Sequence, residues 1–398
     1  MELALEDDID PLAIEVTKEF NDQLEAKNEA TWEHEDLATV RIKVLRGHSE
    51  GVNSCKFFNN DECIVTSSLD KTAKIWNVDS GRVLHTYSAH NANVTQACMS
   101  SENNRLVTAG WDKKVHVWDV ESGKILWTGK HDGVLTCCDI SHDGKLIVTG
   151  SDIDNCLKVW DTSSGETIHK LDDIHSRTIT SCIFSPNDTR IITTSMDKST
   201  NFWDLKTKTS TLRLHGHINI IASCAMSPDE RKFATASWDK TVKIWDVTTG
   251  TYRSQGPDIL AKGHEGSISC CEFSQDGLQL ITGSYDTTIV VWDVDNNVQK
   301  LKLQGHGDWV EDVDISQDQK WLLSCSKDKT VRLWNIAESD KIPVVLENRR
   351  SIGLKMVKCN QCGKPFSMGQ MESLRDVTLC VFCRLQQSEG REHAAIAD

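Results

Sequence analysis

The chain has 398 residues, and its formal net charge of −15 is unevenly distributed. Residues 1–40 hold 13 acidic side chains and 2 lysines, so the rest is nearly neutral and lacks the broad basic surface of proteins that bind phosphate backbones. No apolar run reaches the roughly 18 residues of a membrane-spanning helix, and the acidic N-terminus is unlike a secretory signal. We therefore expect an intracellular protein, in the cytoplasm or the nucleus, whose 15 cysteines are thiols or metal ligands rather than disulfides.

An acidic N-terminal extension, residues 1–37, is predicted to be partly helical. Leu12, Val16, Phe20 and Leu24 recur every four residues and would form one apolar stripe. A helix of about 15 residues is marginal in water by itself. It would therefore pack on the rest of the protein or serve as a peptide for another protein, and disorder is the third alternative.

A unit with a His near its start and a Trp near its end occurs seven times in residues 38–338. The His-to-Trp distance is 28 residues in six copies and 29 in the third. Inside each unit, short alternating segments end at turn signals, as in the sixth unit at residues 267–273, 279–283 and 288–293. A period of about 42 residues with four short strands in each unit predicts an all-β fold, a seven-bladed β-propeller.

The repeats carry Gly-His and Trp-Asp pairs, and on these pairs the chain resembles the WD-repeat family. Gly-His pairs begin at 47, 216, 263 and 305, and Trp-Asp pairs begin at 118, 160, 203, 245 and 292. The resemblance implies that the strand at 39–45 becomes the outer strand of the last blade and removes an exposed sheet edge. The segment 342–346 is the alternative candidate for that place.

The resemblance also implies a buried, hydrogen-bonded tetrad of His, Ser or Thr, Asp and Trp in each blade. In chain order the tetrads are His48, Thr66, Asp70 and Trp76; His90, Thr108, Asp112 and Trp118; His131, Thr149, Asp154 and Trp160; His175, Thr193, Asp197 and Trp203; His217, Thr235, Asp239 and Trp245; His264, Thr282, Asp286 and Trp292; and His306, Ser324, Asp328 and Trp334. The third turn has one extra residue and a second candidate, Asp152, although the distance to the Trp favours Asp154. Seven equivalent copies indicate architecture rather than catalysis, because an active site needs one distinct constellation.

Five propeller cysteines fall seven residues after a repeat His, which places them at one position of the innermost strand. They are Cys55, Cys138, Cys182, Cys224 and Cys271. A cysteine without a partner packs as a small hydrophobe, so we interpret these thiols as core residues.

Residues 339–398 form a linker and a tail with the pattern C-x2-C-x17-C-x2-C. Cys359, Cys362, Cys380 and Cys383 have the spacing of a closed, structural Zn²⁺ site, similar to a zinc ribbon or a treble clef. A redox dithiol and unligated cysteines are the alternatives. Residues 349–384 hold seven Lys or Arg and two acidic residues, so this tail could meet an acidic partner or RNA.

Propellers of this family usually recruit partners on the face that bears the turns, and the residue before each turn Asp is expected there. These residues are Leu69, Trp111, Ile153, Met196, Trp238, Tyr285 and Lys327, with Trp309 nearby. Exposed aromatic rings on neighbouring blades are typical of a binding hot spot, so Trp111, Trp238, Tyr285 and Trp309 are the candidate partner-binding residues. Alternatively, the rings only cover the rim of the channel.

The sequence therefore predicts a non-catalytic interaction scaffold, a monomeric propeller that acts within a larger complex. It would recruit protein or peptide partners through the propeller face and the tail. A substrate receptor of a cullin-type ubiquitin ligase is one alternative, because 203–206 reads Trp-Asp-Leu-Lys and weakly resembles the motif of such receptors. An RNA-associated factor that uses the basic tail is the other.

Overall fold

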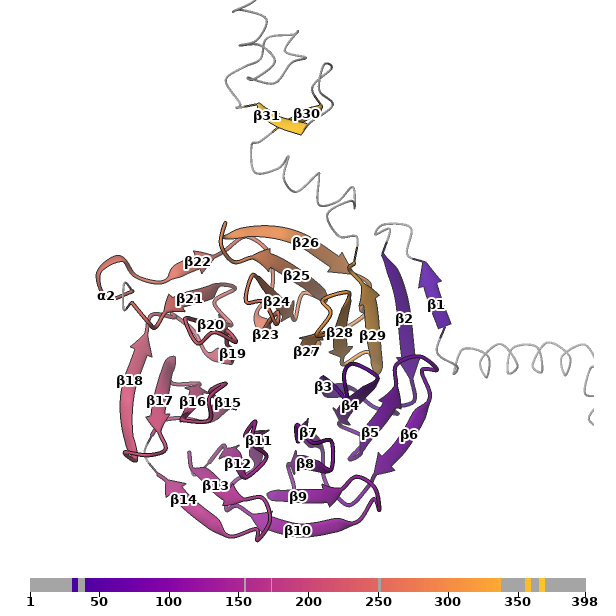
Figure 1. Ribbon diagram of the computed structural model, residues 1–398, viewed down its shortest axis with the longest axis vertical. Helices are drawn as coiled ribbons and strands as arrows, with labels where there is room; N and C mark the ends of the chain where they lie inside the picture. Colours follow the sequence, from indigo (N-terminus) through magenta and orange to yellow (C-terminus); the bar gives the residue numbers. More distant parts are fainter. Residues whose placement is uncertain are drawn as a thin grey trace, which may run out of the picture.

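Seven antiparallel sheets lie radially around one centre in the computed structural model (Figure 1). The structure describes residues 31–34, 40–153, 155–172, 174–249, 252–337, 355–358 and 365–368. Each sheet is one blade, and successive strands of a repeat run from the centre to the rim. The predicted seven-bladed propeller is confirmed.

Six blades have four strands taken from consecutive residues. The first three blades are β3 (Val52–Phe58), β4 (Cys63–Ser68), β5 (Ala73–Asn77) and β6 (Val83–Tyr87); β7 (Val94–Met99), β8 (Arg105–Gly110), β9 (Lys114–Asp119) and β10 (Ile125–Lys130); and β11 (Leu135–Ile140), β12 (Leu146–Ser151), β13 (Leu157–Asp161) and β14 (Thr167–Leu171). The next three are β15 (Ile179–Phe184), β16 (Arg190–Ser195), β17 (Ser199–Asp204) and β18 (Thr209–His215); β19 (Ile221–Met226), β20 (Lys232–Ser237), β21 (Val242–Asp246) and β22 (Asp258–Leu260), with the one-turn helix α2 (Tyr252–Gln255) before β22; and β23 (Ile268–Phe273), β24 (Gln279–Ser284), β25 (Thr288–Asp293) and β26 (Val298–Gln304).

The seventh blade joins the two ends of the propeller. It contains β27 (Val310–Ile315), β28 (Trp321–Ser326), β29 (Thr330–Asn335) and β2 (Arg41–Arg46), with β1 (Thr31–His34) at its edge. Strand β2 pairs with β29 in the register Ile42↔Trp334, and Val40, Ile42 and Val44 are buried in the same apolar cluster as Trp334. The predicted closure by the N-terminal strand is confirmed, and the competing segment 342–346 lies outside the described residues.

Burial decreases from the second strand of a blade to the fourth. All six residues of β4 are buried, whereas four of the five residues of β6 are exposed. The inner strands lie between two neighbouring blades and bury both faces, while the outer strand faces solvent. The five predicted inner-strand cysteines are buried thiols, and burial raises the pKa of Cys55, as expected for core residues rather than nucleophiles.

At the N-terminal end the structure differs from the sequence expectation, and several predicted features at both ends lie outside the described residues. Residues 31–34, assigned above to a partly helical extension, form β1, which pairs with β2 in the register His34↔Arg41. The apolar stripe at residues 12–24 and the four tail cysteines lie outside the described residues. In the tail, β30 (Lys355–Lys358) and β31 (Pro365–Met368) form an antiparallel pair. Within the described chain, no helix is long and apolar enough to cross a membrane.

Candidate functional site: the turn face of the propeller

A hydrogen-bonded tetrad fixes the turn of each blade that forms this face. In blade 1, His48 Nδ1 lies 2.8 Å from Asp70 Oδ2, and His48 Nε2 lies 2.8 Å from Thr66 Oγ1. Because a carboxylate only accepts, Nδ1 carries the proton, and Nε2 accepts the Thr66 hydroxyl. Trp76 Nε1 donates to the same hydroxyl at 2.9 Å. All four side chains are therefore satisfied, and the turn is tied to two strands of its own blade.

The tetrad also determines the charge of its aspartate. Burial alone would raise the pKa of Asp70, but the hydrogen bonds from His48 and Thr72 lower it below its usual value.

The three tetrad contacts of blade 1, His to Asp, His to hydroxyl and Trp to hydroxyl, are also present in blades 2, 5, 6 and 7. The contacts are those of His90, His217, His264 and His306 with their Asp and hydroxyl partners, and of Trp118, Trp245, Trp292 and Trp334 with the same hydroxyls.

Blade 4 departs from this pattern. His175 Nδ1 lies 3.1 Å from Asp197 Oδ2 and His175 Nε2 lies 2.9 Å from Thr193 Oγ1, as expected. Trp203 Nε1, however, is buried and has no hydrogen-bond partner within the described chain. The sequence expectation of a complete fourth tetrad is therefore wrong for this one bond, and nothing in the structure explains its loss.

Blade 3 has a different turn, as its extra residue indicated. His131 Nε2 lies 2.7 Å from Thr149 Oγ1, and Trp160 Nε1 donates to Thr149 at 2.8 Å. Asp152 Oδ1 accepts from the backbone N–H of Val134 at 2.8 Å. Asp154, the aspartate favoured by spacing, lies outside the described residues, so its membership stays a prediction.

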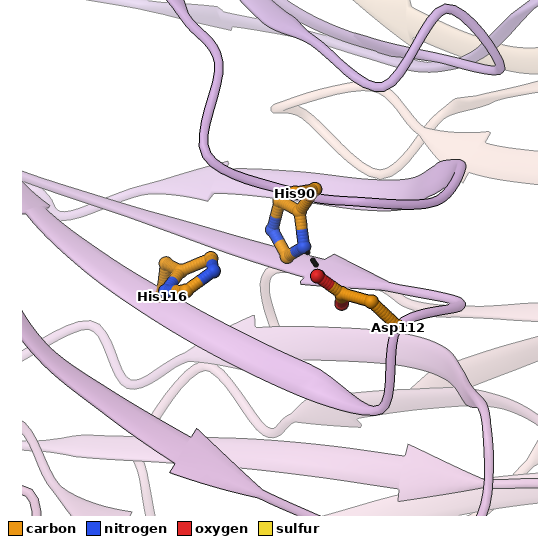
Figure 2. Close-up of side chains that lie close together, drawn as sticks. All are labelled: His90, Asp112 and His116. Carbon is orange, nitrogen blue, oxygen red and sulfur yellow. Dashed lines mark hydrogen bonds and ion pairs between the residues drawn. The ribbon is translucent and has the colours of Figure 1, made fainter.

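Blade 2 has a second histidine beside its tetrad, as Figure 2 shows. One ligand atom from each of His90, Asp112 and His116 lies within 4.8 Å of the others, a grouping that could suggest a metal site. His90 Nδ1 and Asp112 Oδ1, however, satisfy each other at 2.9 Å, as their equivalents do in other blades. We therefore interpret the group as a tetrad with an added His. His116 was not singled out from the sequence. Blades 1, 3 and 5 have Lys at the equivalent position, so a His there is a departure from the repeat that could have identified it.

His116 is only 4% exposed, and its polar atoms are half satisfied. Nδ1 lies 2.8 Å from Thr128 Oγ1, whereas Nε2 is buried with no hydrogen-bond partner in the described part of the chain. Burial, together with the nearby His90, lowers the pKa of His116 to about 4. The ring is therefore neutral in the folded protein at neutral pH.

His116→Lys should raise the free energy of unfolding by about 1 kcal/mol near pH 7.5, because it removes a buried atom that has no partner. The gain should increase toward about pH 5, since the depressed pKa of His116 costs the wild-type protein stability as pH falls below the unfolded value of about 6.5. Urea unfolding of both proteins at the two pH values measures the difference. A gain that does not change with pH would show that His116 is not buried in its neutral form.

The turns lie at one end of the propeller and surround the mouth of the central channel. A cavity of about 510 Å³ there is lined by six of the seven residues that precede the turn aspartates and are expected on the turn face: Leu69, Trp111, Met196, Trp238, Tyr285 and Lys327. The seventh, Ile153, is 77% exposed and does not line the cavity. Trp309 lies beside the last turn, because Lys327 N donates to Trp309 O at 2.9 Å.

Three aromatic rings from blades 5, 6 and 7 form a contiguous group, named here the aromatic cluster: Trp238, Tyr285 and Trp309. The Trp238 and Tyr285 ring centroids are 6.1 Å apart at an angle of 62°, and Tyr285 stacks on Trp309 at 4.7 Å and 30°. Trp309 is 50% exposed and Trp111, in blade 2, is 52% exposed. Trp238, expected to face solvent, is instead half-buried, and its Nε1 is buried and without a partner among the described residues.

A bulge near the start of each inner strand aims one side chain toward the neighbouring blade. In five blades this side chain donates to a backbone carbonyl of the next inner strand: Asn53 to Val94, Thr95 to Leu135, Thr136 to Ile179, Thr180 to Ile221, and Ser269 to Val310. Blades 5 and 7 differ, with Ala222 and Glu311 at this position, and both line the mouth cavity. Sequence reasoning missed Glu311, although it is the one acidic residue at a position that is otherwise small or a donor.

Glu311 forms an ion pair with Lys327, whose Nζ lies 3.5 Å from its carboxylate. Lys327 Nζ also donates to Asn53 Oδ1 at 2.6 Å, which holds the lysine toward blade 1. Burial raises the pKa of Glu311, and Lys327 opposes that shift. The mouth cavity therefore combines aromatic faces with a half-buried carboxylate.

Below the mouth, carboxylates of blade 7 attach the last inner strand to the first. Asp312 Oδ2 accepts from Cys55 N at 3.1 Å, and Asp314 Oδ2 accepts from Phe57 N at 2.7 Å. Lys56 forms an ion pair with Glu272 of blade 6 and lies 3.9 Å from Asp314. Burial raises the pKa of Asp312 to about 6 and that of Asp314 to about 7, and Lys56 opposes both shifts. The channel lining is therefore rich in carboxylates.

Comparison with known proteins agrees with the repeat pattern. The family "WD domain, G-beta repeat" matches residues 39–77, 81–119, 123–161, 165–204, 208–246, 258–293 and 297–335. The chain is 47% identical over 359 residues to human "WD repeat-containing protein 88", a match that covers 89% of this chain and 76% of the relative. It is 30% identical over 184 residues to "Protein tipD" of Dictyostelium discoideum, covering 41% of this chain and 27% of that protein. Over 168 residues it is 27% identical to "Pre-mRNA-processing factor 19" of Oryza sativa subsp. japonica, covering 41% and 31%. The seven matched repeats and the seven blades together establish that the chain belongs to the WD-repeat family.

Proposed function

We propose that this chain is a non-catalytic scaffold that recruits protein or peptide partners at the turn face. The observation that carries the proposal is the aromatic cluster: Trp238 and Tyr285 line the mouth cavity, and Trp309, half exposed, stacks on Tyr285. Rigid aromatic side chains in a concave, partly desolvated surface are the usual anchors of protein interfaces. The tetrads support the non-catalytic part of the proposal, since equivalent copies provide architecture rather than one reactive site.

Removing the exposed anchors should weaken partner capture without unfolding the propeller. We expect Trp309→Ala combined with Trp111→Ala to reduce recovery of specific partners at least about tenfold in quantitative affinity purification, a typical hot-spot effect. Leu278→Ala is the matched control, because Leu278 is 51% exposed in the β23–β24 turn at the opposite end of its blade. Unchanged recovery by the double variant, with thermal unfolding also unchanged, would contradict the proposal.

The tail is proposed to hold one structural Zn²⁺ through Cys359, Cys362, Cys380 and Cys383. Their spacing supports this, and so does the pairing of β30 with β31, in which Lys358 is opposite Pro365. The segment that joins these strands contains the first cysteine pair. Two thiolates from such a segment and two from a second pair would complete a tetrahedral site.

Elemental analysis of the full chain should find about one zinc per molecule, and Cys380→Ser should lose it. The main unfolding transition of the propeller should persist in this variant, because β2 closes the last blade. Cys63→Ser, a change at a propeller cysteine, is the control that should retain the metal. Equal metal content in all three proteins would contradict the assignment.

The two alternative functions are separate hypotheses with weaker support. The ubiquitin-ligase alternative depends on Trp203-Asp204-Leu205-Lys206, in which Lys206 is exposed, and binding of the ligase adaptor tests it. The RNA alternative depends on the basic tail, and salt-dependent RNA binding by the full chain tests it.

A further inference from the structure

We infer that the mouth cavity binds a basic side chain, arginine or lysine, of a partner peptide, between the rings of Trp238 and Tyr285 and the carboxylate of Glu311. The inference rests on the proposed partner-binding function of the turn face and adds the chemistry of the group recognised. Ring faces attract cations, most strongly where water is partly excluded, and a nearby carboxylate adds a charge-assisted hydrogen bond.

The side chains that could hold such a group lie in one sector of the mouth. Tyr285 of blade 6 and Glu311 of blade 7 line the mouth cavity, and Trp309, two positions before Glu311, stacks on Tyr285. Ala222 in blade 5 lines the same cavity as Glu311, at the bulge position where other blades have larger donors. The two blades that lack a donor at the bulge position are therefore those that supply Ala222 and Glu311, and both residues line the mouth cavity with Trp238 and Tyr285.

The charges of the channel favour a cation over an anion. Among the described residues that line the mouth cavity, Glu311 and Asp312 are acidic and Lys327 is the only cation. Deeper in the channel, Lys56 pairs with Glu272 and lies 3.9 Å from Asp314, so acidic side chains outnumber the cation there too. An incoming cation would be attracted to this lining, whereas a carboxylate would be repelled.

The existing ion pair leaves Glu311 able to accept a second partner. Its contact with Lys327 is 3.5 Å, longer than the roughly 2.7–2.9 Å of a charge-assisted hydrogen bond. Lys327 is held instead by Asn53 Oδ1 at 2.6 Å. The Glu311 side chain is still 18% exposed, so a ligand can reach it. Lys327 acts as an internal competitor of the incoming cation.

Exposed lysines surround the acidic centre of the face. Five turn aspartates are each followed by an exposed lysine in the left-handed conformation: Lys71, Lys113, Lys198, Lys240 and Lys329. Lysines around an acidic centre can meet acidic residues that flank a basic anchor. We therefore expect the face to select partner peptides in which acidic residues flank a central Arg or Lys.

Degenerate peptide pools with one fixed central residue provide the test on the immobilised full chain. Four pools have Arg, Lys, Gln or norleucine at the centre, and their flanks contain neither Lys nor Arg. We expect the Arg and Lys pools to be retained about tenfold better than the Gln and norleucine pools. Asp and Glu should be enriched in the flanks of the retained peptides. Equal retention of the neutral pools, or retention of no pool, would overturn the inference.

Two variants should change this preference in opposite directions, an outcome that a purely structural role would not give. Glu311→Gln should abolish the preference for a central cation, and Lys327→Met should increase it by removing the competitor. Glu265→Gln removes an exposed carboxylate of the same face and is the control that should change nothing. An unchanged preference in Glu311→Gln would overturn the inference. If Trp309→Ala combined with Trp111→Ala still reduces partner capture in that case, the partner-binding function stands and only the cation specificity fails.

Discussion

Trp245→Ala should lower the free energy of unfolding by about 3–5 kcal/mol, the usual cost of removing a large aromatic side chain from a core. The indole is 4% exposed and packs in a cluster with Ile192, Phe202 and Phe233, so its removal opens a cavity between two blades. It also removes the N–H that donates to Thr235 Oγ1 at 3.0 Å. Chemical denaturation of both proteins measures the loss.

A second pair of variants separates the hydrogen bond from the packing. Trp245→Phe keeps much of the apolar ring but removes the donor to Thr235, whereas Trp203→Phe removes an N–H that has no partner in the described chain. We expect the first change to cost about 1 kcal/mol more than the second. Equal losses would show that the tetrad bond of blade 5 contributes nothing beyond packing.

Deleting residues 1–46 should abolish soluble expression or strongly lower the melting temperature. The deletion removes β2, in which Ile42, Val44 and Leu45 are each at most 1% exposed. Burial of each such side chain is worth about 1.5–3 kcal/mol, and together they approach the whole stability of an ordinary domain. The loss also exposes the edge of β29, which is a template for aggregation.

Deleting only residues 1–36 is the matched control for closure. This change removes β1, whose partner among the described strands is β2, and leaves the β2–β29 ladder intact. We therefore expect a folded propeller whose melting temperature is much closer to that of the full chain. If both truncations unfold to the same extent, β2 is not the element that closes the ring.

The repeat by itself determined the architecture of this protein. Each blade carries its His, hydroxyl, Asp and Trp at nearly constant spacing, and strand length and turn position follow from that local register. For the same reason the closing strand, the buried inner-strand cysteines and the residues around the channel mouth could be predicted. The helix at residues 12–24 and the zinc site stay predictions, because they lie outside the described residues.

Only the tertiary structure decided the features that depend on contacts between blades or between layers of one blade. Asp312 accepts from Cys55, 257 residues away in the chain, and no local spacing indicates that contact. In the sequence, His116 is one more strand residue, whereas in the structure the centroid of its ring lies 4.4 Å from that of His90. Glu311 joins Trp238 and Tyr285 in the lining of one cavity only when blades 5, 6 and 7 are set side by side. The sequence pattern specifies each blade because its bonds are local, whereas the binding surface arises where blades meet, and its chemistry depends on residues that differ from one repeat to the next.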